Sequence, residues 1–222
     1  MIGKFLKIFA LNGFLTFYLH AESDSTDPVA PMILPEMKNE WLVAIKSELE
    51  NPSIDLLNRD VNTEDLKQLN CLGDMTLSPK EERLKFWQLF LASLVRAESR
   101  FVAHASSGNK SSRAYGLLQM QLATARTHCS KLLDHKIEKK HLIDPEFNLR
   151  CGVHLLNWQV NGAPLYKKNG EMLKKLRPDF TNKLFAVGIL LWGPLRSRDY
   201  SGRKRIYQYF EKYKNNISFC SQ

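Results

Sequence analysis

The sequence predicts a mainly helical fold, and three observations support this. Apolar residues recur at helical spacing through a strongly apolar segment at 84–97. Similar amphipathic patterns are present at 40–49 and at 204–213. No alternation of apolar and polar residues persists long enough to indicate a strand, and the chain has no internal repeat or low-complexity tract.

The segment 84–97 is the central element of the prediction. Leu84, Trp87, Leu91 and Leu94 lie on one helix face, and Glu98 continues the same face. This spacing places a carboxylate at the end of a buried stripe. Since burial disfavours the charged form, we expect Glu98 to hold a proton near neutral pH, as a general acid must.

The start of that helix has its own signal. Ser78 is expected to cap it, Pro79 suits the first helical position, and Glu81 would complete a capping box. The main domain is therefore predicted to begin at Ser78.

The other expected elements follow in order along the chain. Helices are predicted at 40–49, at 63–69, from Thr124 to about Leu133, from Asp144 onwards, at 185–192 and at 204–213, with a basic connection at 165–177. Asn148 is expected to be a structural residue near a helix start.

The first residues resemble a secretory signal peptide. Lys4 and Lys7 precede a mostly apolar run at 8–19, and Ala21 is the expected cleavage point. Such a run is too short to span a bilayer, so no stable membrane insertion is expected after cleavage. An uncleaved anchor is the alternative. The protein is accordingly expected to be exported, to the periplasm or beyond the cell.

Composition and these signals predict four parts. They are a signal peptide at 1–21, an extended proline-stiffened linker with little to pack at 22–37, a helical extension at 38–77 and the main domain at 78–222.

The chain of 222 residues carries a net charge of +9, which favours anionic partners such as nucleic acid, an anionic membrane surface or an acidic cell wall. Export argues against nucleic acid. The histidines lack the H-E-x-x-H spacing of a zinc site, so no metal or other cofactor is expected. A monomer is expected.

Export also gives meaning to the four cysteines, Cys71, Cys129, Cys151 and Cys220, because an even number in an oxidising compartment indicates disulfides. Three pairings are possible. The favoured one joins Cys129 to Cys151, which would tie two successive helices, and leaves Cys71 to clamp the domain ends with Cys220.

Glu98 also stands within a longer motif. The segments Glu98-Ser99-Arg100-Phe101, Ala114-Tyr115-Gly116-Leu117-Leu118-Gln119-Met120 and Thr124-Ala125 span nearly thirty positions. In residue types and spacing they resemble the signature of the lytic transglycosylase and goose-type lysozyme superfamily. The resemblance covers roughly residues 78–213 and implies a lysozyme-like helical domain.

The resemblance further implies cleavage of the β-1,4 bond between N-acetylmuramic acid (MurNAc) and N-acetylglucosamine (GlcNAc) in peptidoglycan, with Glu98 as catalytic acid and base. No Asp or Glu stands between Phe101 and Asp134, and Gln121 and Leu122 occupy the place where a second acid is expected. This favours the lytic reaction, which makes a 1,6-anhydro end without water, over hydrolysis. Asp144 or Asp199, folding back, would be the alternative second acid.

Four residues are expected to contact substrate or to orient Glu98. Ser99 would hold Glu98 by hydrogen bonding, or cap the helix. Gln119 would present its amide to a sugar ring, and Tyr115 and Met120 would form an apolar wall beneath it, unless both are core residues.

One departure concerns substrate choice. Leu190 and Leu191 stand where the family carries a Tyr-Asn pair that helps hold the muramic sugar. The sequence therefore suggests preference for a modified glycan, such as one lacking N-acetyl groups. A non-catalytic, exported wall-binding protein on the same fold is the alternative.

Overall fold

The computed structural model describes residues 32, 34–110, 112–161, 181–185, 192–195 and 200–221. Its α-helices are α1 (Asn39–Leu49), α2 (Thr63–Gln68), α3 (Lys80–Glu98), α4 (Leu122–His128), α5 (Lys139–Ile143), α6 (Pro145–Val160) and α7 (Tyr200–Tyr213). Short 3-10 helices cover Leu56–Asn58, Ser130–Leu132, Gly193–Leu195, Lys214–Asn216 and Ser218–Cys220. None of the described helices is long and apolar enough to cross a membrane.

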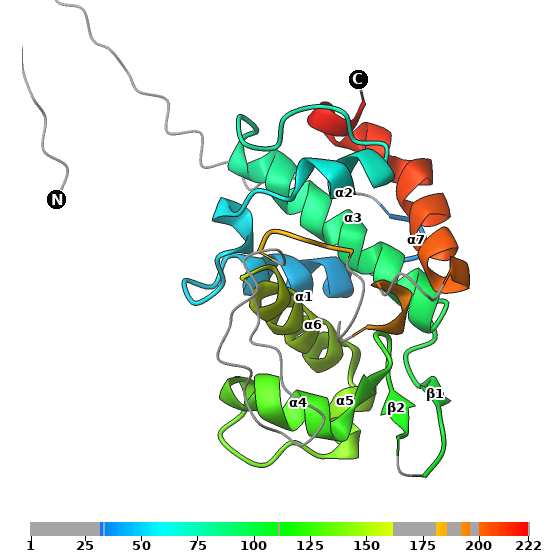
Figure 1. Cartoon of the computed structure of the whole chain (residues 1–222). Helices are drawn as coiled ribbons and strands as arrows, with labels where there is room; N and C mark the ends of the chain where they lie inside the picture. The colour runs from blue at the N-terminus through cyan, green and yellow to red at the C-terminus, as the bar shows by residue number, and fades with distance from the viewer. Residues whose placement is uncertain are drawn as a thin grey trace, which may run out of the picture.

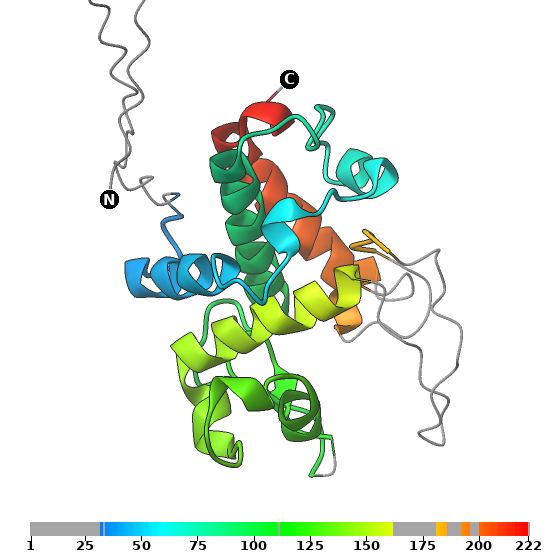
Figure 2. The same ribbon diagram turned by 90° about the vertical axis from the view of Figure 1, so that its left-hand side faces the viewer.

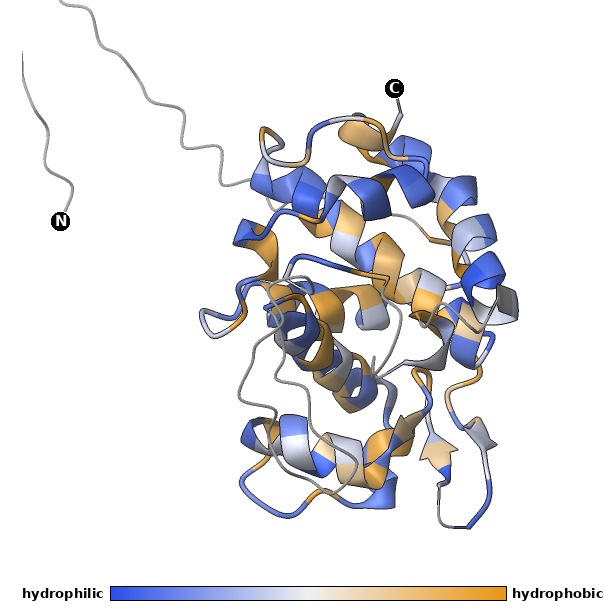
Figure 3. Cartoon of the chain, in the orientation of Figure 1, coloured by the Kyte–Doolittle hydropathy of each residue, from blue (hydrophilic) through white to orange (hydrophobic). Residues whose placement is uncertain are grey.

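Helix α3 runs through the middle of the molecule, with α7 beside it and α1 and α6 crossing below (Figures 1 and 2). Almost every residue of α3 from Leu84 to Val95 is buried, as expected of a helix that is covered on all sides. Figure 3 shows the middle of the same helix as mainly hydrophobic and its first turn as hydrophilic. The predicted mainly helical fold is confirmed.

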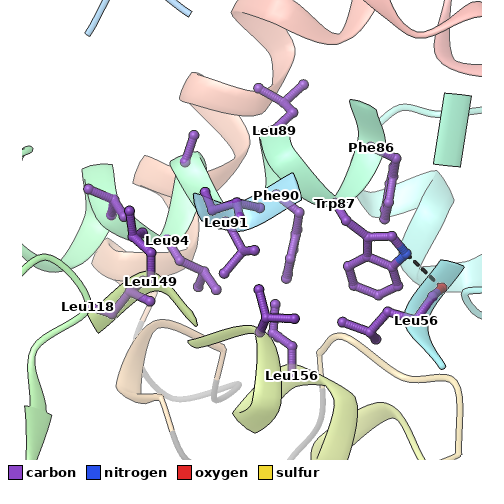
Figure 4. Packing of buried hydrophobic residues seen from close by; sticks show 14 of the residues in the cluster. Leu56, Phe86, Trp87, Leu89, Phe90, Leu91, Leu94, Leu118, Leu149 and Leu156 are labelled. Carbon is purple, nitrogen blue, oxygen red and sulfur yellow. Dashed lines mark hydrogen bonds between the residues drawn. The ribbon is translucent and has the colours of Figure 1, made fainter. Parts of the chain in front are cut away.

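Aromatic side chains of α3 form the centre of the core (Figure 4). Phe86 packs edge-on against Trp87 and stacks with Phe90, with ring centroids 5.3 and 6.2 Å apart. The buried indole of Trp87 donates a hydrogen bond of 2.9 Å to the Leu56 carbonyl, so its one polar atom is satisfied. This contact joins the residues before Ser78 to the same core.

The predicted capping box at the start of α3 is wrong. The helix begins at Lys80, its N-cap is Pro79, and no side chain caps it. The Ser78 hydroxyl donates instead to the Asp74 carbonyl at 2.9 Å. Ser78 lies one residue before the N-cap position, so its hydroxyl bonds within the preceding turn and does not cap the helix.

A small sheet that the sequence did not predict follows α3. Strands β1 (Ser106–Ser107), β2 (Ala114–Tyr115) and β3 (Met120–Gln121) form an antiparallel sheet in that order. Each strand has only two residues, too few to display the alternation that identifies strands.

The helices after this sheet follow the predictions unevenly. The helix expected to reach Leu133 ends at His128 and continues as a 3-10 turn, and the sequence did not predict α5. Helix α6 begins as predicted after Asp144, whose carboxylate accepts from the amide of Glu146 at 3.0 Å. The predicted helix at 185–192 lies mostly outside the described residues, as do the signal peptide, the connection at 165–177 and the Leu190-Leu191 pair.

The end of the expected linker is packed rather than extended. Its described apolar residues, Met32, Leu34 and Met37, are buried in the core. Glu36 accepts hydrogen bonds from Tyr209 and Tyr213 of α7. The prediction of little to pack is wrong here because these apolar side chains belong to the hydrophobic core.

A buried carboxylate joins the extension to the main domain. Glu48 of α1 is 2% exposed and accepts from Arg150 at 2.6 Å and from His154 at 2.8 Å, both on α6. Although burial raises the pKa of Glu48, the hydrogen bonds from His154 and Arg150 lower it to about 2. The carboxylate is thus ionised and doubly paired in the folded protein.

Both predicted disulfides are present. Cys129 after α4 is joined to Cys151 in α6, and Cys71 after α2 is joined to Cys220 near the C-terminus. Each bridge is worth about 2–4 kcal/mol of stability.

Candidate active site

Glu98 is the last residue of α3 and lines a cavity of about 490 Å³. The cavity is bordered by the end of α3, the small sheet, α4, α6, the 3-10 turn at Gly193–Leu195 and α7. Its lining residues are Ala97, Glu98, Ser107, Ala114, Gln119, Met120, Gln121, Thr124, Leu155, Trp192, Gly193, Pro194 and Arg205. Glu98 is the one acidic residue among these described lining residues.

A sharp turn fixes where α3 ends. Ser99 is the C-cap, and its hydroxyl donates to the Val95 carbonyl at 3.3 Å. Arg100 and Phe101 follow with φ angles of 55° and 67°, a left-handed conformation that costs side-chain-bearing residues roughly 1–2 kcal/mol each. The Phe101 ring packs against Tyr209 at 5.4 Å between centroids, a contact that helps hold this turn.

The loop Gly116–Gln119 is held against α6 by one buried side chain. Asn148, which is fully buried, accepts from the Leu118 amide at 2.8 Å. Its amide nitrogen donates to the carbonyls of Leu142 at 2.8 Å and Tyr115 at 3.3 Å. The prediction that Asn148 is structural is confirmed.

Gly116 must be glycine for two reasons. Its φ of 79° lies in the left-handed region, and a Cβ there would lie 2.1 Å from the Leu142 carbonyl oxygen and 2.4 Å from Nδ2 of Asn148. The absence of a side chain allows the loop to sit directly on α5 and Asn148.

Gln119 lines the cavity, but its amide is already engaged within the protein. Its nitrogen donates to the carbonyls of Ala105 at 3.0 Å and Gly116 at 2.8 Å, and its oxygen accepts from the Ser107 hydroxyl at 2.6 Å. These bonds use both amide hydrogens. Gln119 therefore braces the wall of the cavity and has only its oxygen left to offer a sugar.

Of the other residues predicted to contact substrate, one lines the cavity and two do not. Met120 is 2% exposed and lines the cavity. Tyr115 is half-buried in β2, and its ring lies 5.3 Å from the ammonium of Lys139, outside the set of described lining residues. Buried Ser99 is also outside that set. The structure thus brings Glu98, Gln119 and Met120 together at one cavity.

Trp192 and Arg205 are among the lining residues that the sequence reasoning missed. The indole nitrogen of Trp192 donates to the Leu118 carbonyl at 3.2 Å, which ties the 3-10 turn to the Gly116–Gln119 loop. Arg205 reaches the cavity from α7. Neither residue belongs to the motif around Glu98. Both reach the cavity through packing between segments that are distant in sequence.

The described residues include no cluster of three or more His, Cys, Asp or Glu side chains that could hold a metal ion. The site as described consists of one carboxylate, amide and hydroxyl groups, an apolar wall and a guanidinium.

A helical domain with a carboxylate at the end of its central helix, beside a cavity bordered by a small sheet, is a lysozyme-like fold. Solved structures of one protein, DslA, share this fold. DslA (Bd0314), in its wild-type form 2, aligns with a TM-score of 0.56 at 22% identity, over 82% of this chain and 91% of that chain. A mutant of DslA with one glutamate replaced by glutamine aligns with a TM-score of 0.57 at 23% identity and the same coverage. At sequence identities this low, the structural alignments show that the fold is shared and nothing further.

One family model matches the sequence over part of its length. Residues 76–168 match the model of the transglycosylase SLT domain. The predicted resemblance to the lytic transglycosylase and lysozyme superfamily is confirmed. No curated protein matches the chain significantly in sequence.

Proposed function

We propose that the protein cleaves the β-1,4 bond between MurNAc and GlcNAc in peptidoglycan, with Glu98 as its single catalytic acid and base. The observation that supports this most directly is the composition of the cavity. Glu98 is its one carboxylate among the described lining residues, while two-carboxylate glycosidases need a second acid within reach. Asp144, one alternative second acid, is engaged as the N-cap of α6.

A single carboxylate favours the lytic reaction over hydrolysis. The Glu98 carboxylic acid gives its proton to the glycosidic oxygen as the bond from that oxygen to C1 breaks. The C6 hydroxyl of the same muramic sugar then bonds to C1, and the Glu98 carboxylate takes the hydroxyl proton. The product is a 1,6-anhydro end, water is not consumed, and Glu98 returns to its starting state.

The remaining site residues have supporting roles in this proposal. Gln119 and Ser107 brace the wall against which the sugar lies, and Met120 supplies apolar surface. Ser99 holds the turn that follows Glu98. The two disulfides suit an exported protein that works on the cell wall.

The test is substitution of Glu98 by Gln, which keeps the shape of the side chain and removes its proton. We expect release of soluble fragments from purified peptidoglycan to fall by at least a hundredfold. Glu81, exposed in the first turn of the same helix, gives a matched control, and E81Q should retain activity. An E98Q protein as active as the parent would refute the proposal. Mass spectrometry of the fragments distinguishes anhydro ends from reducing ends.

We also propose a preference for glycan that lacks some N-acetyl groups. The support is the sequence alone, since Leu190 and Leu191 replace a polar pair that holds the acetylated sugar in relatives. Loss of such hydrogen bonds shifts preference by about tenfold or more. The test is to digest matched acetylated and de-N-acetylated peptidoglycan and to measure the release of soluble fragments. Equal or faster release from the acetylated wall would contradict the proposed preference.

A further inference from the structure

A second cavity of about 270 Å³ adjoins the one that Glu98 lines. It is bordered by Glu36, Arg96, Arg205, Gln208, Tyr209 and Lys212. We refer to it as the basic side pocket. Arg205 lines both cavities, so a molecule in the main cavity and a group in the basic side pocket would contact the same guanidinium.

The sequence of two neighbouring helices builds this pocket. Arg205, Gln208, Tyr209 and Lys212 stand at positions i, i+3, i+4 and i+7 of α7, which places them in one row along the helix. Arg96 comes from α3, two residues before Glu98. The row therefore extends from the candidate active site along the surface where α3 and α7 pack together.

The charge of the pocket favours an anion. Three of its lining residues, Arg96, Arg205 and Lys212, are cationic and one, Glu36, is acidic. Glu36 accepts hydrogen bonds from Lys212 at 3.0 Å and from Tyr209 at 3.0 Å. The carboxylate is therefore engaged with Lys212, which leaves the two arginines as the excess positive charge.

Arg205 also has unused hydrogen-bonding capacity. Its Nε is buried and has no hydrogen-bond partner among the described residues. A buried donor without a partner is uncommon and costly, so a ligand that accepts from it would be favoured. Guanidinium groups are best matched by planar anions, which they bind through two parallel hydrogen bonds.

We propose that the basic side pocket binds a carboxylate of the peptide stem carried by the glycan strand in the adjoining cavity. This inference rests on the proposed function, because the glycan places the stem beside the pocket. Muramic sugars in the wall carry short peptides whose free carboxylates are the nearest anions to the scissile bond. The pocket would thus make the protein distinguish glycan that bears stems from bare glycan.

Binding measurements on the E98Q protein test this without cleavage. Three soluble tetrasaccharides are compared by titration calorimetry: one with stem peptides, one without, and one whose stem carboxylates are blocked as amides. We expect the first to bind about tenfold more tightly than the other two at low salt, and the advantage to shrink as ionic strength rises. Equal affinity for all three would overturn the proposal.

The variant that isolates the pocket is Arg96→Gln in the E98Q background, because Arg96 does not line the main cavity. We expect it to lose most of the preference for the stem-bearing ligand. Lys67→Gln removes one positive charge from an exposed position of α2 and serves as the matched control. A preference that survives R96Q, or one that K67Q removes equally, would refute the assignment to this pocket.

The two proposals fail in distinguishable ways. If the wild-type protein cleaves peptidoglycan but the three tetrasaccharides bind equally, only the pocket assignment fails. If the stem-bearing ligand binds best and R96Q abolishes that advantage, the pocket is supported even where the wild-type protein cleaves nothing, and the catalytic proposal then fails alone. Binding of free stem peptide as tightly as of the whole ligand would contradict the link to the glycan cavity.

Discussion

The side chain of Asn148 accepts a hydrogen bond from the backbone amide of Leu118 at 2.8 Å, across thirty positions of sequence. Through this bond α6 holds the loop that carries Gln119 and Met120 to the wall of the cavity. The precision of that wall therefore depends on a buried residue that does not itself line the cavity.

Replacing Asn148 by Ala should destabilise the protein and loosen this loop. The Leu118 amide and the Leu142 carbonyl would lose buried partners, at a cost of about 2–3 kcal/mol. Chemical denaturation measures the loss. Asn58→Ala is the control, because the Asn58 hydrogen bond is exposed, and it should change stability by less than about 0.5 kcal/mol. Similar effects of the two substitutions would contradict the account of Asn148.

Replacing Gly116 by Ala should be still more damaging. The new Cβ would clash with the Leu142 carbonyl and with Asn148 in a rigid environment, and we expect a cost of about 3 kcal/mol or more. Gly108 also has a positive φ, of 85°, and a Cβ there would lie 2.8 Å from the Ser112 carbonyl oxygen, but Gly108 is in an exposed loop and not against the core. G108A should cost only about 1 kcal/mol. Thermal unfolding of both proteins checks this, and an equal shift in Tm would argue against the packing explanation.

The buried Glu48 should contribute far more stability than its exposed neighbour Glu50. Glu48→Gln leaves Arg150 and His154 without their carboxylate, which should cost about 2–4 kcal/mol. Glu50 makes an exposed ion pair with Lys46 on the same helix, so E50Q should cost at most about 0.5 kcal/mol. Urea midpoints of the two variants decide between them, and a tolerant E48Q would mean that the α1–α6 contact depends on apolar packing alone.

The same carboxylates predict how stability depends on pH. Hydrogen bonds from Tyr213, Lys212 and Tyr209 outweigh the effect of burial and lower the pKa of Glu36 to about 2, as similar bonds do for Glu48. Because both pKa values are lower in the folded state, the stabilisation is complete above about pH 4.5 and is lost as pH falls towards 2. Denaturation midpoints at several pH values measure this, and the acid-induced loss should be smaller in Glu36→Gln and E48Q. An unchanged pH profile in both variants would be inconsistent with these pairings.

Much of the fold could be predicted because its signals are local. The helical spacing of Leu84, Trp87, Leu91 and Leu94 predicted α3 and the place of Glu98 at its end, and both are as expected. The two disulfides were also predicted correctly, since export and an even number of cysteines left few pairings.

Features made by contacts between distant residues could not be predicted, because no local pattern encodes them. The two-residue strands exist because backbone segments on either side of Gly108 and of Gly116 pair with each other, which no short pattern encodes. Gln119 was expected to face a sugar, but its use as a brace depends on the carbonyls of Ala105 and Gly116. In the sequence, nothing distinguishes Arg205 from the other basic residues. Its place at the cavity results from the packing of α7 beside α3.

The bridge between Cys71 and Cys220 closes a loop of chain that contains every residue lining the main cavity. A protease that cut this loop once, at any position, would leave two pieces still joined covalently at sulfur. Release of Glu98 from Arg205 would require a second cut or a reductant. For a protein that is expected to be exported, this linkage would allow a nicked molecule to keep its site assembled for as long as the noncovalent core holds.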